Sequence, residues 1–78
     1  MVNVNDPETW HPSLTPARIE RAVRRTMRDE AYLGFCVACG RQHSNVEPDA
    51  CGYPCTARKC HGSRTVYGAE ELLFRVQA

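Results

Sequence analysis

The 78-residue sequence has no long apolar run and no cationic, apolar leader at its start. A membrane-spanning helix needs about 18 or more consecutive apolar residues, and a secretory signal begins with a positively charged stretch followed by an apolar one. We therefore expect a cytoplasmic protein with no membrane partner. Thiols stay reduced in the cytosol, so a cluster of cysteines there indicates metal binding before it indicates disulfides.

Motifs of the common catalytic sites are also lacking. The sequence contains no glycine-rich phosphate loop and no serine nucleophile motif, and the residue two positions after each histidine is not glutamate. The last absence excludes the zinc deaminase signature, in which glutamate handles protons. Glu70 and Glu71 are adjacent and are interpreted as a solvated helix face. We expect a protein that is not an enzyme, with no catalytic residue and no small-molecule substrate.

Excess charge is lacking as well, because the net charge is only +1. Binding to nucleic acid therefore has to be argued from the local distribution of charge. A chain this short buries only about 60% of the surface that it exposes when unfolded. Chains of this size commonly need a metal, disulfides or a partner for stability, which gives the five cysteines particular weight.

Residues 1–12 show no apolar periodicity, and Pro7 and Pro12 discourage regular structure. The prediction for this segment is a flexible tail with Trp10 unanchored. Residues 13–33 are predicted to form a basic amphipathic helix. Thr15 is suited to the N-cap and Pro16 to the first helical position, and Gly34 is expected to end the helix in a left-handed cap.

Apolar residues recur in this segment at spacings of three and four, which predicts one helical stripe that docks on the core. They are Ile19, Ala22, Val23, Met27 and Ala31. Five of the ten basic residues lie away from the stripe: Arg18, Arg21, Arg24, Arg25 and Arg28. Arg18, Arg21, Arg25 and Arg28 form a line and are the candidate nucleic-acid-binding residues. Arginines on an exposed helix face are, however, often only solubilising.

Residues 34–78 are predicted to form a zinc-binding module with a short helix at its C-terminal end. Cys36 and Cys39 have the two-residue spacing that lets two thiolates hold one zinc ion, and Gly40 suits the left-handed backbone of such a turn. A second pair is needed, and the candidates for it are Cys51, Cys55, Cys60 and His61. The expected fold class is small α+β, a zinc ribbon of short β-hairpins around one metal behind the N-terminal helix.

Four segments carry a resemblance to a known group of proteins. They are GFCVACG at 34–40, VEPDA at 46–50, YPC at 53–55 and VYGAEELL at 66–73. Through them the chain resembles small zinc-ribbon proteins encoded by bacteriophages and bacterial genomes. The resemblance covers about residues 34–74 and leaves out the basic helix. In that group the second pair is also a two-residue turn followed by glycine, whereas four residues separate Cys55 from Cys60 here.

Carried over position by position, the resemblance implies Cys36, Cys39, Cys55 and Cys60 as the ligands of Zn²⁺. His61 is the alternative for the fourth position, because His61-Gly62 repeats the ligand-then-glycine order of Cys39-Gly40. Cys51 stands where the resembling sequences usually have another residue, which favours a spare thiol. His43 is interpreted as a loop histidine with no role.

Two kinds of partner agree with a phage or prophage origin, which the resemblance implies. The arginine line predicts binding to a nucleic-acid backbone, with an affinity that falls as salt rises. The alternative is an adaptor or inhibitor that docks a host complex such as RNA polymerase or a defence system. The sequence favours nucleic acid slightly.

Overall fold

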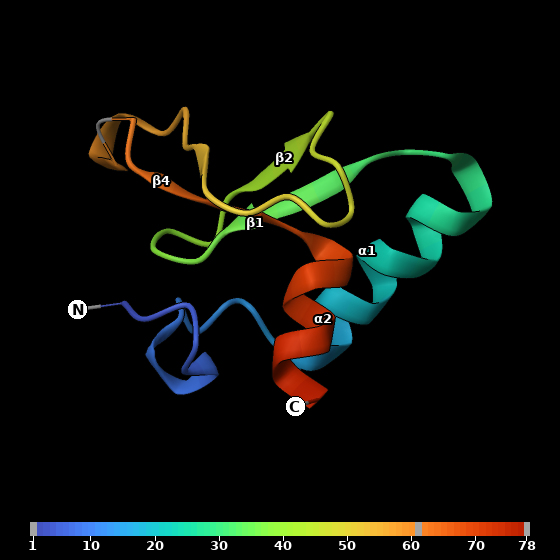
Figure 1. Ribbon diagram of the computed structural model, residues 1–78, viewed down its shortest axis with the longest axis horizontal. Coiled ribbons are helices and arrows are strands. Elements are labelled where there is room, and N and C mark those ends of the chain that lie inside the picture. Colours follow the sequence, from blue (N-terminus) through green and yellow to red (C-terminus); the bar gives the residue numbers. More distant parts are fainter. Residues whose placement is uncertain (1, 61, 78) are drawn as a thin grey trace.

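The computed structural model describes residues 2–60 and 62–77, and an antiparallel sheet organises them. The strands are β1 (Leu33–Cys36), β2 (Gln42–Ser44), β3 (Tyr53–Pro54) and β4 (Arg64–Gly68). Their order is β2-β1-β4-β3, with every neighbouring pair antiparallel. Two helices, α1 (Pro16–Asp29) and α2 (Ala69–Gln77), cover one side of the sheet (Figure 1). Together with the sheet they make a small α+β fold.

Side chains alternate between the two faces of the central strand β1 and so divide the interior into two parts. Phe35 points toward the helices and joins an apolar core that includes Trp10, Ile19 and Leu72. The next residue, Cys36, points the other way into a second cluster that contains the other buried cysteines, Val46, Ala50 and Val66. The strand therefore joins a helical core to a cysteine-rich core.

Helix α1 starts where the sequence predicts and ends earlier. The Thr15 side chain accepts a hydrogen bond from the Arg18 backbone N–H at 3.2 Å, which satisfies one of the free amides of the first turn. The helix stops at Asp29, because Glu30 takes the left-handed conformation with φ of 55°. The predicted cap at Gly34 is wrong. Leu33 and Gly34 already belong to β1.

Gly34 is required by close packing in the sheet. A Cβ at this position would lie 2.7 Å from the Tyr67 carbonyl oxygen and 2.7 Å from Val46 Cγ1. Neither neighbour can give way easily, since one is strand backbone and the other is a methyl group of a buried, β-branched side chain. The glycine therefore serves the pairing of β1 with β4 and leaves room for Val46.

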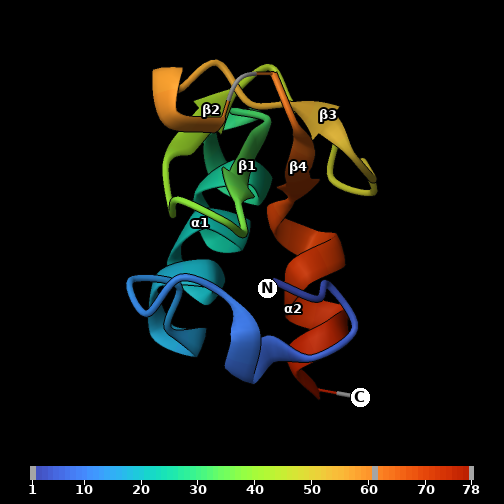
Figure 2. The same cartoon turned by 90° about the vertical axis from the view of Figure 1, so that its left-hand side faces the viewer.

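The two helices run in opposite directions and lie side by side (Figures 1 and 2). Within the predicted apolar stripe of α1, Ile19 and Ala22 are buried and Val23 is half-buried. Met27 is 79% exposed, so its assignment to the docking face is wrong. The helix ends soon after Met27 and the chain turns away to β1, which leaves this residue without cover from the sheet.

The predicted flexible tail is packed against the domain. Trp10 is only 5% exposed and belongs to the helical core, and its Nε1–H donates to the Asn3 carbonyl at 3.2 Å. Arg75 on α2 donates from Nη1 to Asn5 Oδ1 at 2.6 Å, which ties the segment to the other end of the chain. Figure 2 shows residues 2–15 crossing the ends of both helices. The prediction of an unanchored Trp10 is wrong.

No helix in the described part of the chain is long and apolar enough to cross a membrane.

Candidate metal centre

Four cysteine sulfurs meet at the end of the sheet that lies away from the helices. The Sγ atoms of Cys36, Cys39, Cys55 and Cys60 all lie within 4.8 Å of one another. Cys36 Sγ is 3.7 Å from Cys60 Sγ, and Cys39 Sγ is 3.7 Å from Cys55 Sγ. A disulfide would need about 2.05 Å. Four sulfurs at about 2.3 Å from one tetrahedral zinc are about 3.8 Å apart, so the cluster has the size of a metal site.

The first pair of sulfurs is presented by the turn that follows β1. The Gly40 N–H donates to the Cys36 carbonyl at 2.7 Å, and the Cys39 N–H lies 3.4 Å from Cys36 Sγ. Gly40 has a φ of +78°, which a side chain would make unfavourable, and a Cβ there would also collide with Ser13 Oγ. The same turn is held from outside, because the His11 N–H donates to the Val37 carbonyl at 2.8 Å. The N-terminal segment thus braces the turn.

The second pair is brought together by a 3₁₀ turn, η2 (Arg58–Cys60). The Ala57 N–H lies 3.4 Å from Cys55 Sγ, which repeats the amide-to-sulfur contact of the first turn. The Cys60 N–H then donates to the Ala57 carbonyl at 3.0 Å. This extra turn accommodates the four residues between Cys55 and Cys60, so the longer spacing still places both sulfurs in one cluster.

Burial makes two of these thiols, those of Cys55 and Cys60, difficult to ionise in the absence of a cation. Burial raises the pKa of Cys60 to about 12 and also raises the pKa of Cys55. At Cys36, burial acts in the same direction, but hydrogen bonds with Thr65 Oγ1 and the backbone N–H groups of Cys39 and Ala38 outweigh it and lower the pKa to about 7. Thr65 Oγ1 is 3.0 Å from Cys36 Sγ. A divalent cation would offset the charge of the thiolates.

His43 is a neighbour of the cluster that the sequence interpretation missed. It lies on β2 opposite Gly34, and its Nε2 is 3.6 Å from Cys55 Sγ. Burial and the positive charge of Arg41 both lower the pKa of His43, which favours the neutral imidazole. With its proton on Nε2, the ring donates to the sulfur as an outer-shell partner of the site. The only signal in the sequence is the position of His43 four residues after Cys39, a short distance from a predicted ligand.

The other two candidates for a metal ligand are Cys51 and His61. Cys51 is exposed and lies apart from the cluster, with Sγ 3.6 Å from the Asp49 carbonyl oxygen and 3.7 Å from Glu71 Oε1. His61 lies outside the described residues. Among the described residues, the cysteines that meet are the four implied by the resemblance.

The predicted nucleic-acid-binding arginines occupy different environments on α1. Arg18 is half-buried, with its guanidinium carbon 4.7 Å from the centre of the Phe35 ring and Nη1 3.0 Å from Ser13 Oγ. Arg25 and Arg28 are exposed and lie 4.0 Å and 3.3 Å from Asp29 carboxylate oxygens. Arg21 and Arg24 are also exposed. The structure therefore uses Arg18 in packing and leaves the other arginines at the surface.

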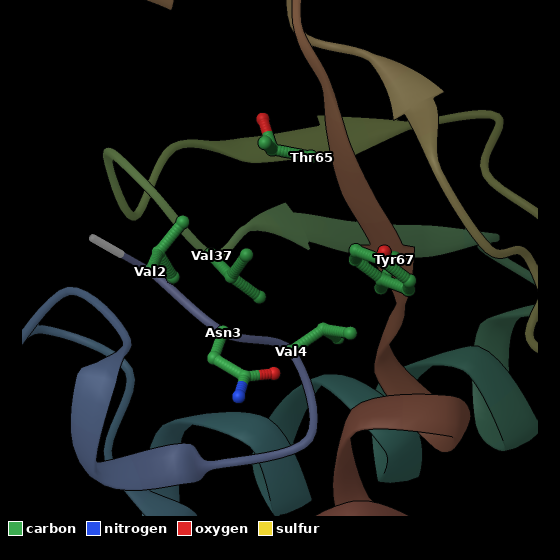
Figure 3. A pocket seen from close by; sticks show the side chains of 6 residues that line it. All are labelled: Val2, Asn3, Val4, Val37, Thr65 and Tyr67. Carbon is green, nitrogen blue, oxygen red and sulfur yellow. The ribbon is translucent and has the colours of Figure 1, made fainter.

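An open hollow of about 470 Å³ lies beside the cysteine turns, between the N-terminal segment and the sheet. Figure 3 shows its lining side chains, which come from residues 2–4, from the turn after β1 and from β4. They are Val2, Asn3, Val4, Val37, Thr65 and Tyr67. None of the six carries a carboxylate, an amine or an imidazole.

Comparisons with family models, with curated proteins and with solved structures found no match to this chain.

Proposed function

We propose that the four clustered cysteines bind one Zn²⁺ and that the metal stabilises the fold of a zinc ribbon. The observation that carries this proposal is the approach of four sulfurs to tetrahedral spacing. Amide N–H groups beside Cys36 and Cys55 would reduce the excess charge of a four-thiolate site, which is −2 with zinc bound. Binding energy of the metal then becomes folding energy, as in other small metal-binding domains.

A site of this kind supports a structural role and no catalysis. A catalytic zinc keeps one coordination position for water, whereas four protein ligands fill a tetrahedral ion. We therefore propose a non-enzymatic module that works in the reducing cytoplasm, where its thiols remain available to the metal.

The metal proposal is tested on purified protein by native mass spectrometry and circular dichroism. We expect one zinc per chain, and a loss of folded signal when a strong chelator removes it. Tetrahedral sulfur sites also accept iron, so elemental analysis must distinguish the two metals. A metal-free protein with an unchanged spectrum would refute the structural role, and iron as the bound metal would refute the choice of zinc.

We propose further that the exposed face of α1 contacts the backbone of a nucleic acid. The support is a set of exposed guanidinium groups on one helix, at Arg21, Arg24, Arg25 and Arg28. Each phosphate contact releases counterions, so affinity should fall steeply with salt. Arg18 contributes less to this surface because it already packs on Phe35.

An electrophoretic shift titration at two salt concentrations tests this contact. Alanine at Arg21, Arg24 and Arg25 together is expected to weaken binding and to reduce the log–log salt slope by about 2 to 3. The matched control is alanine at Arg41, Arg58 and Arg64, which removes the same charge from exposed positions off α1. Equal losses in both variants would show a general charge effect and would refute a specific role for the helix.

The second candidate function is that of an adaptor that docks another protein, including a host complex if the chain is of phage or prophage origin. The observation that favours it is the exposure of two large apolar side chains, Met27 at 79% and Phe74 at 70%. Exposed apolar patches bordered by polar residues often mark protein interfaces. Absence of any shift with single- or double-stranded probes at about 10 μM, where weak non-specific binding begins, would favour this reading.

A further inference from the structure

The two helices leave an apolar strip uncovered on their outer side. Val23 and Met27 on α1 and Leu73 and Phe74 on α2 line one groove of about 390 Å³, together with Glu70 and Gln77. Val23 and Leu73 form its half-buried floor, and Met27 and Phe74 project from its walls. A further hollow of about 410 Å³ lies against Phe74, lined by Pro48, Asp49, Glu70 and Glu71. Phe74 therefore stands between two recesses.

Opposite charges border the two halves of this strip. On α1, Arg24 lies about 60° round the helix from Met27 and Arg28 about 100°, at 3.6 residues per turn, and both are exposed. On the α2 side, Glu70 and Asp49 are exposed beside Phe74. The surface is thus basic along one edge and acidic along the other. If a second copy is related by a two-fold axis that runs along the groove, the basic edge of each copy lies against the acidic edge of the other.

We propose that this strip is an interface between two copies of the chain, with α1 of each copy lying against α2 of its partner. In a two-fold interface the same patch meets itself, so the patch must be self-complementary. Met27 of one copy would fill a recess beside Phe74 of the other, and Arg24 would face Glu70. A basic amphipathic helix of another protein would meet the same groove and is an alternative outcome of the test.

The exposed area indicates a weak and reversible dimer. Covering two Met27 and two Phe74 side chains removes roughly 500 Å² from water, and the borders add to this area. Stable interfaces bury about 1,200 Å² or more in total. We therefore expect a dissociation constant in the micromolar range, which depends on salt through the charged edges.

This interface is separate from the metal site, although it shares Arg24 and Arg28 with the proposed nucleic-acid face of α1 and Met27 and Phe74 with the proposed adaptor surface. Strand β4 begins beside the cysteines and leads directly into α2, so the strip lies at the other end of this strand from the metal. Arg21 and Arg25 lie about 120° and 160° round α1 from Met27, away from the groove. Self-association can therefore be measured in variants that keep their metal.

Analytical ultracentrifugation of the metal-loaded protein from about 1 to 500 μM, a range that spans weak interfaces, tests the proposal. We expect concentration-dependent dimers in the wild type and at least a tenfold weaker association in Phe74→Ser. The matched control is Tyr53→Ser, which removes an aromatic side chain that is 36% exposed on β3 and should associate normally. Metal content and circular dichroism of each variant establish that it is folded.

Charge reversal provides the second arm. Arg24→Glu and Glu70→Arg should each lose self-association, because each brings like charges together twice in the two-fold complex. An equimolar mixture of the two variants should recover the dimer, since both contacts then join opposite charges. A wild type that stays monomeric at 500 μM would overturn the proposal, as would a mixture that fails to associate.

Discussion

Replacement of Trp10 by alanine tests whether the N-terminal segment belongs to the fold. Trp10 is 5% exposed, and a buried aromatic side chain removes about 150 to 250 Å² from water. At about 25 cal/mol per Å², its burial stabilises the fold by about 4 to 6 kcal/mol as an upper bound. Truncations of buried aromatics cost about 3 to 5 kcal/mol. A domain of this length has only about 4 to 12 kcal/mol in total.

The expected result is a large fall in stability. Guanidinium chloride unfolding, followed by circular dichroism at a fixed excess of zinc, measures the midpoint. With a slope of about 2 kcal/mol per molar denaturant, the midpoint of Trp10→Ala should fall by about 1.5 to 2.5 M. Trp10→Phe keeps most of the apolar contact and should fall by less than half as much.

The matched control is Tyr32→Ala, because the Tyr32 side chain is 52% exposed and its loss should cost less than about 1 kcal/mol. Equal midpoints for the wild type and Trp10→Ala would refute the packing of Trp10 against the core and would support the predicted flexible tail. A second readout follows from the contact of His11 with the first cysteine turn. Trp10→Ala should also lose its metal faster to a chelator.

Further predictions concern the glycines, the outer shell of the metal and pH. Gly34→Ala should destabilise the protein by about 2 kcal/mol or more in the same unfolding assay, because its Cβ would press on Tyr67 and Val46. The control is Gly62→Ala, which has open space around it and should cost only about 1 kcal/mol for its positive φ. Equal losses of stability in the two variants would contradict the packing argument. His43→Ala should retain its metal but release it about tenfold faster to a chelator, because Cys55 Sγ loses its contact with His43 Nε2. Complete loss of the metal from this variant would instead show that His43 is a ligand. Metal affinity should fall as pH falls, because protons compete for the thiolates. Cys60, whose pKa is raised to about 12, must release a whole proton on binding at pH 7, which titration in weak buffer detects; binding without proton release would refute the thiolate site.

The local sequence determined much of the cysteine-rich part of the fold. The Cys36–Cys39 spacing and the glycine after it require a tight turn, and the structure forms that turn with Gly40 at positive φ. The resemblance over residues 34–74 pointed to the four cysteines that the structure brings together. Such inferences succeed because a few consecutive residues fix the geometry of a turn.

Long-range packing decided the features that local patterns leave open. Proline and the lack of periodicity made residues 1–12 look like a tail, but Trp10 finds a core built from residues 14–72. Gly34 looked like a helix cap, yet its lack of a side chain is needed by Tyr67 and Val46 across the sheet. His43 reaches Cys55 only because β2 pairs with β1. Each of these depends on which distant surfaces meet, and spacing along the chain does not specify that.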